Sequence, residues 1–152
     1  MIITGTRFGN IDYSTEDIIH FPEGMIGFDK MQDYVVINTK EGSPFRWLQS
    51  LEEPKLAFLV SLPETFMEGY SPEIKDEEAQ AIGLTPETEH LVFVTTTIPA
   101  GKPKEATANL VAPIVVNLQT RKAKQVILDS EAYTIRYPIF SESCVHAEKV
   151  AA

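Results

Sequence analysis

The chain has 152 residues with 13 basic and 22 acidic side chains, which give a formal net charge of −9 at neutral pH. This length suits one domain with its own hydrophobic core, and 43% apolar residues are typical of a globular protein. The acidic excess argues against direct binding to nucleic acid or to an anionic membrane surface, because phosphate groups are met by clustered Lys and Arg. A basic partner is compatible with this charge.

Targeting signals and cysteine chemistry are equally limited. The first residues show no charged region followed by an apolar stretch and a cleavage site, so we expect no secretory signal. The longest apolar runs, such as residues 56–60, are far shorter than the ~18 residues of a membrane span. Cys144 is the single cysteine, which excludes an internal disulfide framework. Together these features predict a cytoplasmic protein.

Short runs rich in β-branched and aromatic residues recur along the chain between Gly, Pro, Asp and Ser, and they predict strands. In chain order the predicted strands are Ile2–Phe8, Ile18–Phe21, Tyr34–Thr39, Phe45–Leu51, Leu56–Leu62, Leu91–Ile98, Asn109–Asn117, Ala123–Leu128 and Ala132–Arg136. The fold class is therefore mainly β. We expect a small closed or partly open antiparallel β-barrel, with a short acidic helix or loop as an insertion. Residues 1–140 would form this domain, and residues 141–152 a disordered tail.

Two strands and one connection carry further detail. Leu56–Leu62 is apolar on both faces, which predicts a central strand that is covered on both sides. Pro113 lacks the N–H that a sheet needs, so it predicts a bulge, a bend or an edge position. Residues 40–44 are typical of a hairpin loop.

One helix is predicted over residues 71–83. Ser71, Pro72 and Glu73 have the residue types of a helix start, and Gly83 can end the helix. The segment from Glu52 to His90 holds ten acidic and two basic residues, a net charge of −8, so almost the whole acidic excess lies there. It predicts a negative face that steers a basic partner, although a solvated surface that keeps the protein soluble explains the same pattern. The candidate partner-binding acids are Glu64, Glu68, Glu73, Asp76, Glu77 and Glu78.

Catalytic motifs are missing from the sequence. It contains no nucleophile elbow, phosphate-binding loop or dinucleotide fingerprint. Cys144 and His146 form a pair without further ligands nearby, which is too few for a metal site. Carboxylates are plentiful enough for paired-acid catalysis, but the densest ones fall in a loop and an exposed helix. We therefore predict neither an enzyme, nor a cofactor, nor a metal.

Two aromatic segments are candidates for structure or for binding. Gly24 and Gly27 follow a proline and predict a tight turn over Phe21–Phe28. Phe45 and Trp47 share one face of a predicted strand. Aromatic anchors are common in interfaces, yet a single Trp in a small β domain is also typical of a core. The sequence leaves both interpretations of Trp47 open.

Four segments in a fixed order resemble the flagellar assembly factor family FliW. They are FPEGMIGF at 21–28, PFRWLQS at 44–50, ANLVAPIVVN at 108–117 and QVILDSEAY at 125–133. The resemblance covers residues 1–140, with Met25 where leucine is more usual. It implies a small, non-catalytic, cytoplasmic β protein that binds flagellin and, in exchange, the RNA-binding translational regulator CsrA. Holding the regulator would make flagellin synthesis follow flagellin secretion.

The resemblance leads to two hypotheses and leaves one alternative. The acidic residues would capture the regulator, and an apolar surface near Trp47 or the Phe21–Phe28 turn would hold flagellin. The alternative is a β-barrel that carries a small ligand. Such a carrier needs an apolar pocket of roughly 300 Å³ or more, whereas a barrel filled with side chains leaves none.

Overall fold

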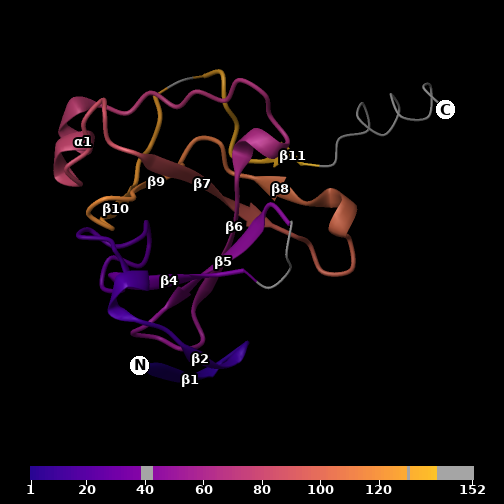
Figure 1. Ribbon diagram of the computed structural model, residues 1–152. Coiled ribbons are helices and arrows are strands. Elements are labelled where there is room, and N and C mark those ends of the chain that lie inside the picture. Colours follow the sequence, from indigo (N-terminus) through magenta and orange to yellow (C-terminus); the bar gives the residue numbers. More distant parts are fainter. Residues whose placement is uncertain (39–42, 130, 140–152) are drawn as a thin grey trace.

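Most of the regular secondary structure in the computed structural model, which describes residues 1–38, 43–129 and 131–139, consists of strands (Figure 1). The one α-helix and three short 3-10 turns lie between them. In chain order the elements are β1 (Ile2–Thr6), β2 (Gly9–Asp12), η1 (Thr15–Asp17), β3 (Ile19–His20), β4 (Asp33–Ile37), β5 (Phe45–Ser50), β6 (Ala57–Ser61), η2 (Pro63–Thr65), α1 (Asp76–Ala81), β7 (His90–Thr97), η3 (Pro103–Glu105), β8 (Thr107–Ala108), β9 (Ile114–Asn117), β10 (Ala123–Gln125) and β11 (Tyr137–Pro138).

The larger sheet runs in the order β10-β9-β7-β6-β5-β4-β3, and all its neighbours are antiparallel. Strand β8 pairs with the end of β7 on one side and with β11 on the other. Strands β1 and β2 form a separate hairpin. The mainly β, antiparallel prediction is confirmed, but a closed barrel is not what the described residues show. The two end strands meet only near one bridge, between His20 and Lys122, instead of through a ladder.

Alternation along the strands divides the buried side chains among three clusters. Phe93 and Ile114 enter the main cluster, while the adjacent Val94 and Val115 point to the opposite face and enter two smaller ones. The main cluster is almost fully buried and contains Ile19, Phe21, Met25, Tyr34, Leu48, Val60, Phe93, Ile114, Val116 and Ala123. This strand periodicity is why one curled sheet can hold several cores.

The predicted central strand is present as β6, which pairs with β5 on one side and β7 on the other. It is not covered along its whole length, because Ala57–Leu59 are only half-buried. Pro113 lies between β8 and β9 and interrupts the strand predicted over residues 109–117, as its missing N–H predicts. The predicted strand over residues 132–136 is wrong, since the pairing segment is β11, just beyond it.

The predicted helix is shorter than its sequence signals indicate. It begins at Asp76 after Lys75, and Ser71 is not its cap. Instead the Ser71 backbone N–H donates to the Tyr133 hydroxyl at 3.1 Å. Gly83 does end the helix, with φ +70°, a conformation that favours glycine. Nowhere in the described part of the chain is a helix long and apolar enough to cross a membrane.

Candidate functional site

Strands β6 and β7 separate partway along their length and leave a groove between them. Their register joins Val60 to Thr95 and Ser61 to Val94, and it goes no further. The hydroxyls of Ser61 and Thr96 form a hydrogen bond of 2.9 Å, which links the two strands where their backbone pairing ends. Beyond it lies an open groove of about 950 Å³, lined on its two sides by residues 57–59 and 95–98. We call it the β6–β7 groove.

One wall of the groove is the tight turn at Phe21–Phe28. Gly24 adopts φ +69°, and a Cβ at this position would lie 2.5 Å from the Asp29 Cα, so only glycine fits. The Gly24 N–H donates to the Phe21 carbonyl at 2.9 Å, and the Phe28 N–H donates to the Met25 carbonyl at 2.8 Å. The turn thereby buries Met25 in the main cluster and leaves Ile26 exposed at the groove.

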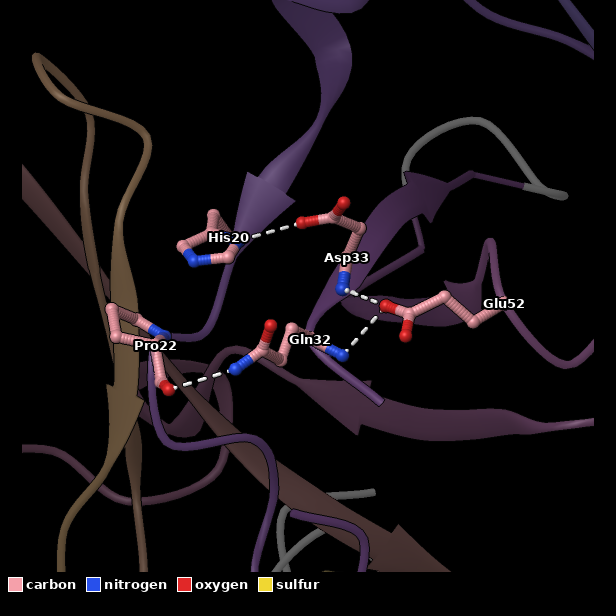
Figure 2. A network of polar contacts seen from close by, with 5 residues as sticks. All are labelled: His20, Pro22, Gln32, Asp33 and Glu52. Carbon is pink, nitrogen blue, oxygen red and sulfur yellow. Dashed lines mark hydrogen bonds and ion pairs between the residues drawn. The ribbon is translucent and has the colours of Figure 1, made fainter. Parts of the chain in front are cut away.

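A polar network fastens the base of this turn to β4 (Figure 2). The Gln32 side-chain amide donates to the Pro22 carbonyl at 3.0 Å, and a Glu52 carboxylate oxygen accepts the backbone N–H groups of Gln32 and Asp33 at 2.7 and 2.8 Å. His20 Nδ1 lies 2.7 Å from the Asp33 carboxylate. One carboxylate therefore orders two backbone donors at the start of β4, which fixes the wall before any partner arrives.

Gln125 of β10 ties the turn to the floor of the groove. Its Oε1 accepts the Ile26 N–H at 3.0 Å, and its Nε2 donates to the Ala112 carbonyl at 3.1 Å. Asn109 Oδ1 in turn accepts the N–H groups of Val111 and Ala112 at 3.0 and 3.2 Å. Side chains therefore satisfy part of the backbone of the irregular segment before Pro113, beside its backbone hydrogen bonds to Thr95, Leu128 and Thr134.

Trp47 lies in the groove and does not belong to any of the buried clusters. It is half-buried, and its ring meets the Phe8 ring edge-on at 5.5 Å between centroids. The Arg7 guanidinium lies 4.2 Å from the Trp47 ring centroid, at cation–π distance. Among the described residues that line the groove, Arg7 carries the only charge.

Isoleucines surround the groove at its rim. Ile26, Ile98, Ile127 and Ile135 are 53%, 45%, 58% and 63% exposed. Half of the eight large apolar side chains that are exposed in the described residues thus face one groove. A cluster of exposed apolar side chains is typical of a binding surface, whereas single exposed apolar residues occur on most proteins.

All four segments that carry the family resemblance contribute to this groove. Residues 21–28 supply Met25 and Ile26, residues 44–50 supply Trp47, and the segments 108–117 and 125–133 supply five further residues. The contributions of these last two segments are Asn109, Val111, Ala112, Gln125 and Ile127. Sequence reasoning missed Arg7, Ile98 and Ile135, because nothing local distinguishes them from ordinary strand or loop residues.

The predicted acidic residues fall into two separate groups. Glu64 and Glu68, here called the η2 acidic group, line a hollow of about 550 Å³ together with Phe45. This hollow lies at the β11 corner, where Phe66 stacks on Tyr137. Phe45 and Trp47 therefore line different hollows, although both lie on the same face of β5.

The remaining acids lie at or just before the helix, well away from η2 in Figure 1. Glu73 lines a third hollow of about 440 Å³, beside an ion pair of 2.7 Å between Lys75 and Asp129. The hydrogen bond and charge of Asp129 raise the pKa of Lys75. We call these acids the α1 acidic group, which consists of Glu73, Asp76, Glu77 and Glu78.

Metal-binding chemistry finds no support in the described residues, where no three His, Cys, Asp or Glu side chains are placed to hold one ion. Cys144 and His146 lie outside the described residues. The sheet and its groove define a mainly antiparallel β protein with an open, mainly apolar groove.

Comparison with known proteins identifies the family. The FliW protein family model matches residues 2–139. The flagellar assembly factor FliW of Leptospira biflexa is 43% identical over 94% of this chain and 94% of its own length. That of Caldanaerobacter subterraneus is 38% identical over 93% of this chain and 95% of its own. A crystal structure of a flagellar assembly factor FliW, 30% identical, superposes with a TM-score of 0.85 over 93% of this chain and 99% of that one. The chain belongs to the FliW family.

Proposed function

We propose that this protein is a cytoplasmic flagellar assembly factor that binds flagellin and, in exchange, a CsrA-type translational regulator. Its action is binding, without catalysis. When flagellin is secreted, the protein is released to hold the regulator away from flagellin messenger RNA, and synthesis falls or rises with secretion. The observation that carries the proposal is the β6–β7 groove, an open apolar surface to which all four family segments contribute.

Flagellin is assigned to the groove. A chain awaiting secretion exposes apolar segments, and covering them takes an apolar surface that is itself accessible. The four rim isoleucines satisfy this requirement, and Trp47 offers a flat aromatic anchor at the centre. The order already present in the walls also lowers the entropy lost on binding.

The regulator is assigned to the acidic surfaces. A protein that binds RNA presents Lys and Arg, so a negative surface attracts it over several ångströms without close fit. The α1 and η2 acidic groups lie outside the groove, and Glu64, Glu68, Glu73, Asp76 and Glu77 are exposed. Because the two groups are separated, they would contact different parts of the regulator or attract it together through their long-range electrostatic field.

The groove volume also satisfies the size requirement of a small-ligand carrier, since about 950 Å³ exceeds the roughly 300 Å³ that such a site needs. Its shape favours the macromolecular partner, because the groove is open and bordered by strands on two sides. A carrier buries most of its ligand, whereas an open groove leaves a small molecule largely in water.

Exchange of the two partners tests the proposal. The protein is immobilised, saturated with the purified regulator, and then titrated with purified monomeric flagellin. We expect flagellin to release the regulator in a dose-dependent manner, and both to co-purify with the protein from native cells by mass spectrometry. Failure of both proteins to bind would reject the proposal. Binding of a small apolar metabolite in their place would support the carrier.

A further inference from the structure

The open side of β6 presents backbone groups to the groove. The Leu56 carbonyl accepts the Ser50 N–H at 3.0 Å, and the Leu62 N–H donates to the Pro44 carbonyl at 3.3 Å. Even-numbered residues therefore direct their N–H and C=O toward β5. Because successive residues of a strand alternate, Ala57 and Leu59 direct theirs into the groove.

Strand β7 presents the matching edge on the other side. The Thr95 carbonyl accepts the Asn109 N–H at 2.9 Å, so odd-numbered residues face the β8–β9 edge. The even-numbered Thr96 and Ile98 then face β6. Continued pairing from Val60 and Thr95 would place Ala57 opposite Ile98, yet the register ends before these residues. Two strand edges thus border the groove without a strand between them.

These edges lack the features that normally prevent strand addition. Natural proteins protect open edges with charged residues, proline or bulges. Here residues 57–59 are Ala, Phe and Leu, and residues 96–98 are Thr, Thr and Ile. An extended peptide that enters such a groove gains backbone hydrogen bonds from the edge, while pockets on either side select its alternate side chains.

The lining also specifies the composition of the peptide. Its rim of isoleucines favours apolar side chains. Arg7, the single charge among the described lining residues, makes no ion pair within the described chain and is held on the Trp47 ring. A guanidinium held in this way is a ready partner for one carboxylate.

We propose that the β6–β7 groove takes an extended, apolar segment of its partner as an added strand on the open edge of β6, with a carboxylate of that segment against Arg7. The proposal rests on the proposed function, because flagellin is the partner that supplies the segment. It specifies the form in which that partner binds, which is an extended strand and not a helix laid across the rim.

Amide exchange distinguishes the two forms. The 15N-labelled protein is mixed with unlabelled monomeric flagellin, and the exchange of each backbone amide is followed by NMR. We expect the Ala57 and Leu59 amides to exchange at least about tenfold more slowly in the complex, since they become hydrogen-bonded. Binding that perturbs the rim methyl groups but leaves these amides unprotected would overturn strand addition and leave the proposed function intact. If flagellin does not bind at all, both fail.

Two pairs of variants give an independent readout in the same full-length protein. Ala57→Pro removes the groove-facing N–H at an edge position that can accept proline, whereas Ala57→Ser keeps it. We expect flagellin affinity to fall about tenfold in Ala57→Pro and clearly less in Ala57→Ser, so that the difference between the two variants reports the lost N–H. Thermal unfolding and circular dichroism verify that each variant is folded. Should Ala57→Pro misfold, the amide exchange of the parent protein decides alone.

The second pair addresses the carboxylate. Arg7→Gln should lower flagellin affinity about fivefold and reduce its salt dependence, while Arg7→Lys should keep the salt dependence and recover part of the affinity. Equal affinity and equal salt dependence in all three proteins would overturn the contact with Arg7.

Discussion

The β6–β7 groove and the acidic surfaces are built in opposite ways. Groove residues come from segments spread between Arg7 and Ile135, brought together by the sheet and by side chains that bond across it. The acidic groups come from residues 64–78 alone, in a loop, a 3-10 turn and a six-residue helix. The groove depends on the whole fold, whereas the acids depend on little beyond their own position in the chain.

This difference teaches how each surface can work. Contacts at a groove need fixed walls, and Gln125, Glu52 and Gln32 supply the bonds that fix them. Charge acts at distances of several ångströms and tolerates movement, so exposed carboxylates without a rigid frame are sufficient. We therefore expect groove variants to change how long a partner stays and acidic variants to change how fast it arrives.

The largest expected effect is on the wall of the groove. Gly24→Ala places a Cβ against the Asp29 backbone and forces alanine into φ +69°. We expect a loss of about 2–4 kcal/mol in the free energy of unfolding, measured by urea denaturation. Flagellin affinity should fall with it, since the turn carries Ile26.

Gly27→Ala is the matched control in the same turn. Gly27 has φ +87°, but nothing lies within 4 Å of an added Cβ. Only the backbone strain remains, and we expect a loss of about 1–2 kcal/mol. Equal losses in the two variants would show that the close approach of Asp29 does not determine the turn.

The next largest effect is on flagellin affinity, with the free energy of unfolding left nearly unchanged. Ile127→Gln and Ile135→Gln each remove an apolar rim contact and leave the net charge unchanged. We expect each to weaken flagellin binding about tenfold, because burial of an isoleucine contributes on the order of 1.5 kcal/mol. The free energy of unfolding should change by less than about 0.5 kcal/mol, as both side chains are mostly exposed.

Ile2→Gln is the control for these rim variants. Ile2 is 64% exposed, close to the 63% of Ile135, but it does not line the groove. Titration calorimetry should give parental flagellin affinity for this variant. A similar loss in all three would show that general surface hydrophobicity, and not the groove, determines binding.

Charge reversal tests the other side of the comparison. Replacing the α1 acidic group by lysine should slow association with the regulator about tenfold at low salt and flatten its salt dependence, measured by stopped flow. Reversal of the η2 acidic group, with two charges instead of four, should have the smaller effect. Reversal of Glu105 and Glu131, two exposed acids outside both groups, is the control. An unchanged association rate in both acidic groups would reject their role.

The sequence predicts the two surfaces unequally for a physical reason. Strand periodicity, the end of the helix at Gly83 and the interruption at Pro113 are local consequences of backbone chemistry, and the structure confirms them. Ser71 and Pro72 have the residue types of a helix start, but the contact of Ser71 with Tyr133 overrides them. That contact spans 62 positions, and no local propensity contains it.

The groove was predictable only in part, and again local features were predictable whereas long-range packing was not. Trp47 and the Phe21–Phe28 turn are named from the sequence because their residue types are unusual there. Ile98 and Ile135 are not, since a strand or loop isoleucine is exposed or buried according to what packs over it. The charge sum locates the acids correctly in the chain, yet it cannot show that the fold separates them into two groups.

The smallest effect concerns the core behind the groove. The Tyr34 hydroxyl is buried and has no hydrogen-bond partner among the described residues, and its ring contacts Phe58, which lines the groove. Tyr34→Phe removes this unsatisfied group and should raise the free energy of unfolding by about 0.5–1 kcal/mol at neutral pH, without changing flagellin affinity. Tyr70→Phe is the contrasting variant. The Tyr70 hydroxyl donates to the Leu110 carbonyl at 2.6 Å, so its loss should cost about 1 kcal/mol.

The same tyrosine makes stability depend on alkaline pH. Burial, followed by the nearby Glu52 carboxylate, raises the pKa of Tyr34 to about 12 from its ordinary value of 10.0. Because the folded protein favours the protonated phenol, this contribution is fully present below about pH 10 and is lost as the pH rises toward 12, by about 2–3 kcal/mol. Burial also raises the pKa of Tyr70, so the free energy of unfolding of Tyr34→Phe still falls with pH, although less steeply. Urea denaturation at pH 8 and pH 11 should therefore show a smaller loss in Tyr34→Phe than in the parent, and an equal loss would mean that the phenol reaches water before the protein unfolds.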